Sequence, residues 1–177
     1  MTDAIALDMD DLRAVAAYAV ASAADVLNLF EQHYPADSRP REAIDAARAF
    51  ASGGTRNKDL RDTAWAALKA AQSADNAAAA EAARSAMAAA AAAYLHPLAR
   101  ASQVRHILGA SAHAARATEL AAGDLPPTGA DYIARTARKA SPHLIAVLTR
   151  FPPAPTGGGR VGTLLRTLDA ALRQPAA

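Results

Sequence analysis

Residues 94–123 read YLHPLARASQVRHILGASAHAARATELAAG, and this stretch decides the fold. After Pro97, small and apolar residues recur at helical spacing on two opposite sides of the segment. One side carries aliphatic residues such as Ile107, and the opposite side carries His106 and His113, two turns apart. Because a helix with apolar residues on two sides is enclosed by neighbours, we expect a central helix of a helical bundle.

The composition of the whole chain extends this expectation. Of 177 residues, 53 are alanine, and the remaining hydrophobic residues number only 39. Alanine has the highest helix propensity and a low preference for strands, and its small side chain lets helices approach closely. The length fits one domain with a sizeable core. We therefore predict an all-α fold, a single-domain bundle of about six to eight helices.

Prolines, glycines and capping residues set the expected helix limits. The expected helices span residues 8–33, 38–53, 57–72, 75–93, 98 or 102 to 122, 130–139, 142–148 and 161–172. The run FPPAPTGGGR is the clearest linker in the chain. The chain is thus divided into a helical bundle (1–151), a Pro/Gly linker (152–160) and a C-terminal helix (161–177). That last helix is too short to stand alone, so we expect it to dock on the bundle or on a partner subunit, as in a homodimer.

Two helices carry specific expectations about burial. The third should bury four residues at helical spacing: Leu60, Ala64, Trp65 and Leu68. The fourth is the alanine-rich segment 74–93, in which 14 of 20 residues are alanine. We expect Asp75 to cap it, and Glu81 and Arg84 to lie on its solvent side.

Several classes of protein are disfavoured by simple features. Cysteine is absent, which excludes disulfides, thiolate metal sites and cysteine nucleophiles. The N-terminus MTDAIALDMDD is acidic and lacks the pattern of a secretory signal. Charged residues interrupt the apolar run 77–93, so we do not expect a membrane span there. A soluble cytoplasmic protein is expected.

Charge is unevenly distributed along the chain. Residues 1–88 carry 13 acidic and 9 basic side chains, and residues 89–177 carry 4 acidic and 10 basic ones. The asymmetry fits either a charged face for a partner or attraction between the two halves within the bundle. The sequence leaves both interpretations open.

No residue pattern supports a metal site, a cofactor site or a catalytic centre. His106 and His113 are seven residues apart, roughly 10 Å along a helix, which is too far for one tetrahedral ion. The serines and Glu119 near them form a triad only by arbitrary selection. Paired carboxylates such as Asp10 and Asp11 lie at helix starts, where they stabilise the helix dipole. We therefore expect no metal ligand, no cofactor and no catalytic residue. The sequence favours a protein that is not an enzyme but leaves that question open.

Two further motifs are weak. The glycines at 157–159 neither follow a strand nor precede Lys-Ser/Thr, so we interpret them as a hinge and not as a phosphate loop. A nucleic-acid interface requires basic residues that line one face, and the candidates are Arg135, Arg138, Lys139, Arg150 and Arg160. They are sparse and lack an aromatic platform, so nucleic acid is not the expected partner.

Three segments resemble the putative immunity protein family of bacterial polymorphic toxin systems. They are Leu27-x-Leu29-Phe30-Glu31, the segment RPREAIDAAR at 39–48 that ends in Gly53, and YLHPLARASQVRHILGASAHAARATEL at 94–120. The segment RFPPAPTGGGRVGTLLRTLDAALR at 150–173 is similar to longer members. The resemblance implies a small all-helical protein that protects its producer by binding a toxin and blocking its active site. It supplies no catalytic residues.

These observations leave three hypotheses of different kinds. The first is a non-enzymatic protein-binding module, an immunity protein that binds a toxin through charged residues of its first helix: Asp8, Asp10, Asp11, Asp25 and Glu31. The second is a small-ligand-binding protein or enzyme with an interhelical pocket lined by His96, Arg105, His106, His113 and Arg116. The third is binding of nucleic acid through the basic residues named above.

Overall fold

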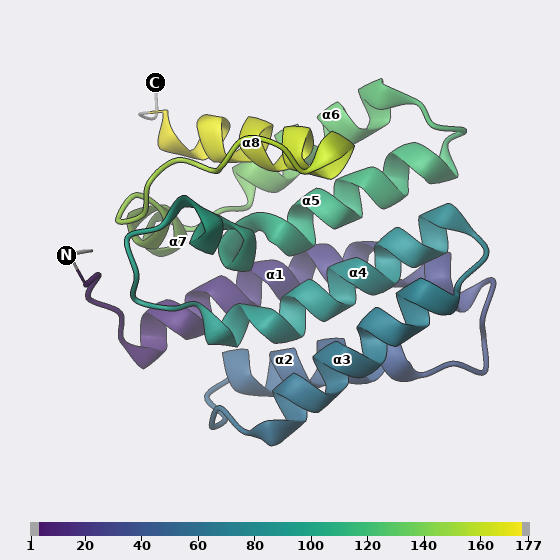
Figure 1. The fold of residues 1–177 in the computed structure, drawn as a ribbon, viewed down its shortest axis with the longest axis horizontal. Helices are drawn as coiled ribbons and strands as arrows, with labels where there is room; N and C mark the ends of the chain where they lie inside the picture. The colour runs from purple at the N-terminus through teal and green to yellow at the C-terminus, as the bar shows by residue number, and fades with distance from the viewer. Residues whose placement is uncertain (1–3, 175–177) are drawn as a thin grey trace.

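The computed structural model describes residues 4–174, which form one bundle of eight α-helices and no strand (Figure 1). The all-α fold and the expected number of helices are thus confirmed. The helices are α1 (Met9–Glu31), α2 (Arg39–Ala51), α3 (Lys58–Ser73), α4 (Ala77–Ala91), α5 (Val104–Ala121), α6 (Pro126–Arg138), α7 (Pro142–Leu148) and α8 (Gly159–Arg173). Two 3₁₀ turns, η1 (Ala92–Tyr94) and η2 (Ala101–Gln103), connect α4 to α5.

Helices α4 and α5 form the centre of the bundle. Helix α4 packs on α1, α2, α3 and α5, while α5 also packs on α1, α6 and α8 (Figure 1). Nine of the ten buried residues of α4 are alanine, and the tenth, Ser85, donates a hydrogen bond to the Ala110 carbonyl at 2.7 Å. Small side chains on both helices permit this close approach. The two-sided pattern of residues 94–123 therefore belongs to an enclosed helix, as expected.

Helix α1 has a capping box at its start. The Asp8 carboxylate accepts from the Asp11 amide at 2.8 Å, and the Asp11 carboxylate accepts from the Asp8 amide at 3.2 Å. Helix α1 is long and apolar enough to cross a membrane, but the same is true of core helices in soluble helical bundles. In this fold it is a core helix, with Val15 and Phe30 at most 1% exposed.

Several expected helix starts were wrong. Asn76, and not Asp75, caps α4, because its side-chain oxygen accepts from the Ala79 amide at 2.9 Å. Helix α6 begins at Pro126 instead of residue 130, since prolines fit the first helical turn, where no amide donor is needed. Helix α8 begins at Gly159, two residues earlier than expected.

The burial of Trp65 was also predicted wrongly. Its side chain is 60% exposed, the largest value among the exposed large hydrophobic residues. The buried positions Leu60, Ala67 and Ala71 define one face of α3, and at 100° per residue Trp65 points about 140° away from it. Alanine, and not tryptophan, fills the space between α3 and α4.

The C-terminal helix α8 packs on α5 and α6 of the same chain. It buries Leu164, Leu165, Leu168 and Leu172. Arg173 holds the preceding linker by donating to the carbonyls of Leu148, Phe151 and Pro152, at 3.3, 3.0 and 3.2 Å. The apolar face of α8 is therefore covered within the chain, and a homodimer through this helix stays a prediction.

Candidate functional site

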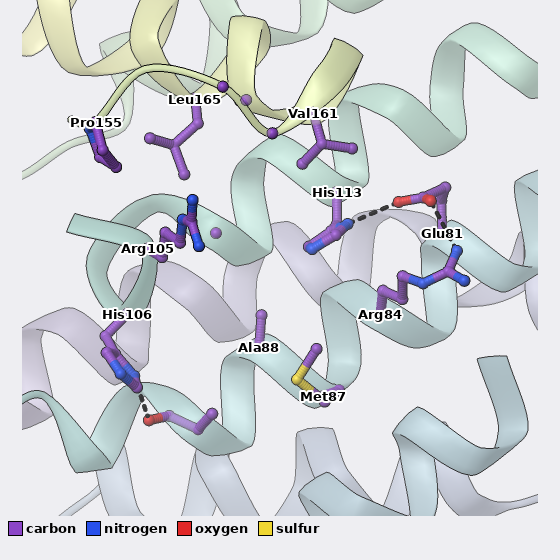
Figure 2. Close-up of a pocket in the computed structure, with 15 residues that line it drawn as sticks. Glu81, Arg84, Met87, Ala88, Arg105, His106, His113, Pro155, Val161 and Leu165 are labelled. Atoms are coloured by element: carbon purple, nitrogen blue, oxygen red, sulfur yellow. Dashed lines mark hydrogen bonds and ion pairs between the residues drawn. The ribbon is translucent and has the colours of Figure 1, made fainter. Parts of the chain in front are cut away.

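A groove of about 470 Å³ lies between α4, α5 and the segment formed by the linker and α8 (Figure 2). Helix α5 supplies its floor, α4 one wall, and the linker with α8 the other wall. Its lining residues are Glu81, Arg84, Met87, Ala88, Ala91, Arg105, His106, Gly109, His113, Pro155, Gly157, Gly158, Val161, Gly162 and Leu165. Three of the five residues predicted for an interhelical pocket, Arg105, His106 and His113, thus line one concave site.

One end of the groove is a polar network between α4 and α5. The His113 Nδ1 and Glu81 Oε2 atoms lie 2.6 Å apart, and Arg84 donates to the other Glu81 oxygen at 2.8 Å (Figure 2). Burial alone raises the pKa of Glu81, but the hydrogen bond from His113 and the charges of His113 and Arg84 hold this pKa below its usual value. The Glu81 side chain is only 14% exposed, so the expected solvent-side position was wrong.

The histidine at the other end has a different environment. The ring of His106 bonds through Nδ1 to the Ala91 carbonyl at 3.2 Å, at the end of α4 (Figure 2). Burial lowers the pKa of His106 and outweighs the effect of this hydrogen bond. His96 stands edge-on to His106, with ring centroids 6.3 Å apart, but His96 itself is exposed and does not line the groove.

Between these two ends the groove is mainly apolar, with one charged side chain. Met87 and Val161 lie on opposite walls (Figure 2). Gly109 of α5 also lines the groove, and its lack of a side chain leaves space there. Arg105 projects into the groove from α5 and is exposed (Figure 2). Within residues 4–174 Arg105 forms no ion pair, whereas Arg84 pairs with Glu81. Arg105 is therefore the arginine in the groove that is free to pair with an anionic ligand.

Arg116 belongs to a separate cluster of charged residues around the buried Glu119. It donates to Glu119 at 2.9 Å and pairs with Asp124, and Arg160 from the start of α8 donates to both Glu119 oxygens at 3.1 Å. Burial raises the pKa of Glu119, but the hydrogen bonds from Arg160 and Arg116 lower it below the usual value. The cluster attaches α8 to α5. Arg116 takes part in this attachment and does not line the groove.

The acidic residues proposed for an interaction face all have partners within the chain. Asp11 is buried and binds His143 at 2.7 Å and Arg150 at 2.6 Å. Asp8 accepts a hydrogen bond from the Asp11 amide, and Asp10 forms an ion pair with Arg13. Asp25 accepts a hydrogen bond from Tyr132 and pairs with Lys139, and Glu31 pairs with Arg41. Asp10 keeps 79% of its side chain exposed. A contact between this face and a toxin stays a prediction, carried by the exposed members.

The basic residues proposed for nucleic acid are largely engaged as well. Lys139, Arg150 and Arg160 form ion pairs with Asp25, Asp11 and Glu119. Arg135 stacks on the Tyr132 ring, with its guanidinium carbon 5.7 Å from the centroid. Arg138 is exposed. Three of the five charges are thus partly neutralised inside the chain.

His106 and His113 bond to different partners, and within residues 4–174 no group of three or more histidine, aspartate or glutamate side chains is placed to hold an ion.

Two features of the site were missed by the sequence analysis. The first is the pair Glu81 and Arg84, which reach His113 and the groove from α4. They are the only charged residues in the run 77–93, and the sequence could have indicated their role in this way. The second is an exposed cluster around Trp65 of α3, where the guanidinium groups of Arg56 and Arg61 both lie over the Tyr94 ring of η1. An aromatic residue within an otherwise polar stripe was its signal.

Fold and site together define a class: an all-helical bundle with an apolar core, an open interhelical groove and ion pairs to buried carboxylates between its helices. Residues 6–142 match the family described as Imm-5 like putative immunity protein. The chain belongs to this family, which confirms the resemblance found in the sequence. The match covers α1 to α6, and the segment 150–173 lies beyond it. No curated protein and no solved structure matches the chain.

Proposed function

We propose that this protein is an immunity protein that neutralises a bacterial toxin in the cytoplasm by binding it directly. The observation that carries the proposal is family membership over residues 6–142, which include six of the eight helices. A direct inhibitor of this kind works through its surface and needs no catalytic residue of its own.

The construction of the bundle supports the proposal. Ion pairs to buried carboxylates connect elements that are distant in sequence, such as Asp11 with Arg150 and Glu119 with Arg160. Such connections hold surface side chains in place before a partner arrives, and less conformational entropy is then lost on binding. A rigid scaffold of this kind suits tight inhibition.

The proposal is tested by co-expression with the toxin encoded beside this gene. We expect cells that produce both proteins to grow, and cells that produce the toxin alone to stop growing. The purified chain should bind a catalytically inactive form of the same toxin in a calorimetric titration. Growth arrest despite co-expression, together with no measurable binding, would rule out the proposed role.

A second candidate is supported by the groove itself. A concave site of about 470 Å³ with apolar walls and one unpaired arginine fits a small organic anion with an apolar body. We would titrate a panel of aliphatic and aromatic carboxylates and record amide NMR spectra of the wild type and of Arg105→Ala. Binding predicts shifts confined to Gly109, Gly157 and Gly158 that are lost in the variant. Unchanged spectra across the panel would remove this candidate.

A further inference from the structure

The outer face of α3 exposes the single tryptophan of the chain. Trp65 is 60% exposed, although tryptophan is highly buried on average. One exposed apolar side chain is ordinary on a soluble protein. What distinguishes Trp65 is the set of residues around it.

A stack of two arginines on one tyrosine lies beside Trp65. The guanidinium carbons of Arg56 and Arg61 are each 5.6 Å from the centroid of the Tyr94 ring, within cation–π range. Arg61 is one turn before Trp65 on the same side of α3, so the two side chains are neighbours. We call Arg56, Arg61, Trp65 and Tyr94 the Trp65 cluster.

Contacts to the backbone hold this cluster in place. The Tyr94 hydroxyl donates to the Asn57 carbonyl at 3.0 Å, at the start of α3. Arg56 donates to the Ala93 carbonyl at 3.3 Å. Arg56 and Tyr94 are thus ordered in the free protein, so less of their conformational freedom is lost when a partner binds.

The charge around the cluster favours an acidic partner. On the exposed stripe of α3, Lys58 is paired with Asp62 at 2.8 Å, which neutralises both. Arg56, Arg61 and Lys69 form no ion pair with a carboxylate in the described part of the chain. Tryptophan, tyrosine and arginine are also the residues enriched where binding energy concentrates in protein interfaces.

We infer that the Trp65 cluster is the surface that holds the toxin, with the indole in an apolar pocket and the two arginines against carboxylates of an acidic toxin surface. This inference rests on the proposed immunity function and names the contact that the function uses. It places the contact on Arg56, just before α3, and on Arg61 of α3, and not on the acidic residues of α1.

The first test measures affinity for the inactive form of the neighbouring toxin. Trp65→Ala should weaken binding by about 30-fold or more, the loss that marks a residue central to an interface. The control is Leu125→Ala, which truncates another exposed apolar side chain (49% exposed) on a different part of the bundle. The control should change affinity by less than about fivefold.

A charge reversal tests the polarity of the partner. Arg61→Glu should slow association and weaken binding by about tenfold or more, with a reduced dependence on salt. Arg138→Glu makes the same charge change at an exposed site on α6 and serves as its control. If Asp10→Lys weakens binding and Arg61→Glu does not, the toxin contacts the acidic residues of α1 and the inference is overturned.

A direct readout comes from the single tryptophan. With 5-fluorotryptophan incorporated in this chain alone, the ¹⁹F resonance should show a solvent isotope shift that disappears in the toxin complex. A resonance that responds to single-stranded RNA but not to the toxin would overturn the inference in favour of nucleic acid.

The outcomes separate this inference from the function on which it rests. If the wild-type chain neither protects cells nor binds the toxin, the proposed function fails, and the inference fails with it. If the wild-type chain binds but Trp65→Ala and Arg61→Glu bind equally well, only the inference fails. Loss of binding in Arg105→Ala would then place the contact in the groove.

Discussion

Arg160, in the first turn of α8, donates to both carboxylate oxygens of Glu119, a residue of α5 with no exposed surface. Arg116 binds the same carboxylate one turn earlier on α5. A buried carboxylate is tolerated because two guanidinium groups satisfy it. The pair therefore fixes the helix that forms one wall of the groove.

Arg160→Ala should reduce the free energy of unfolding by about 2 kcal/mol, because it removes one of the two guanidinium partners of the buried Glu119 carboxylate while Arg116 remains. Urea unfolding followed by circular dichroism measures this change. The control Arg138→Ala removes an exposed arginine of α6 and should lie within about 0.5 kcal/mol of the wild type. Equal unfolding midpoints for the two variants would mean that the ion pair does not hold α8.

Two glycine-to-alanine substitutions should change the melting temperature in opposite directions. A Cβ at Gly129 would lie 2.5 Å from Glu119 Cγ and would overlap its carboxylate, whereas a Cβ at Gly109 meets only Ala88 Cβ at 3.9 Å. Both glycines are in helices, where alanine is otherwise favoured by about 1 kcal/mol. Gly109→Ala should thus raise the melting temperature, and Gly129→Ala should lower it. A Gly129→Ala protein as stable as Gly109→Ala would show that Glu119 is not confined there.

Asp11 should make the stability of the bundle depend on pH. Burial raises the pKa of Asp11, but hydrogen bonds from Arg150 and His143 prevail and lower it to about 2. Because the folded pKa is below the unfolded value, its contribution is present above about pH 4 and is lost as the pH falls towards 2. The contribution is about 2 kcal/mol.

The measurement compares the wild type with Asp11→Asn in urea at pH 7 and pH 2.5. The difference in unfolding free energy should be largest at pH 7 and should become small at pH 2.5. The control Asp10→Asn alters a side chain that is 79% exposed and should change stability by less than about 0.5 kcal/mol at pH 7. A difference for Asp11→Asn that is the same at both pH values would contradict the assignment of the low pKa.

Much of the fold could be predicted because its determinants are local. Alanine content specifies helix, and proline and glycine divide the chain into segments of the observed number and order. One error, at the start of α4, occurred where two neighbouring residues could serve the same purpose. Asp75 and Asn76 are both good caps, and only the path of the chain selects Asn76.

The site could be predicted only in part because it depends on packing between helices. The positions of His106 and His113 on one side of α5 follow from their spacing. Their partners come from α4, and the opposite wall comes from α8, which no local pattern specifies. Arg116 was assigned to the pocket, although a glutamate three residues later, at 119, is a standard partner on a helix.

The exposure of Trp65 yields a prediction that needs no partner. The apolar residues of α3 allow two choices of buried face, and the structure selects the alanine face, so that Trp65 is left in solvent. Trp65→Ala should therefore change the free energy of unfolding by less than about 0.5 kcal/mol, as expected for a surface substitution.

Phe50→Ala removes an aromatic side chain that is 1% exposed and should cost about 3–5 kcal/mol. Urea unfolding of both variants measures the contrast, and acrylamide quenching of the single tryptophan in the wild type measures its exposure directly. A large loss of stability in Trp65→Ala, with quenching as weak as for a buried indole, would mean that α3 packs on its tryptophan face.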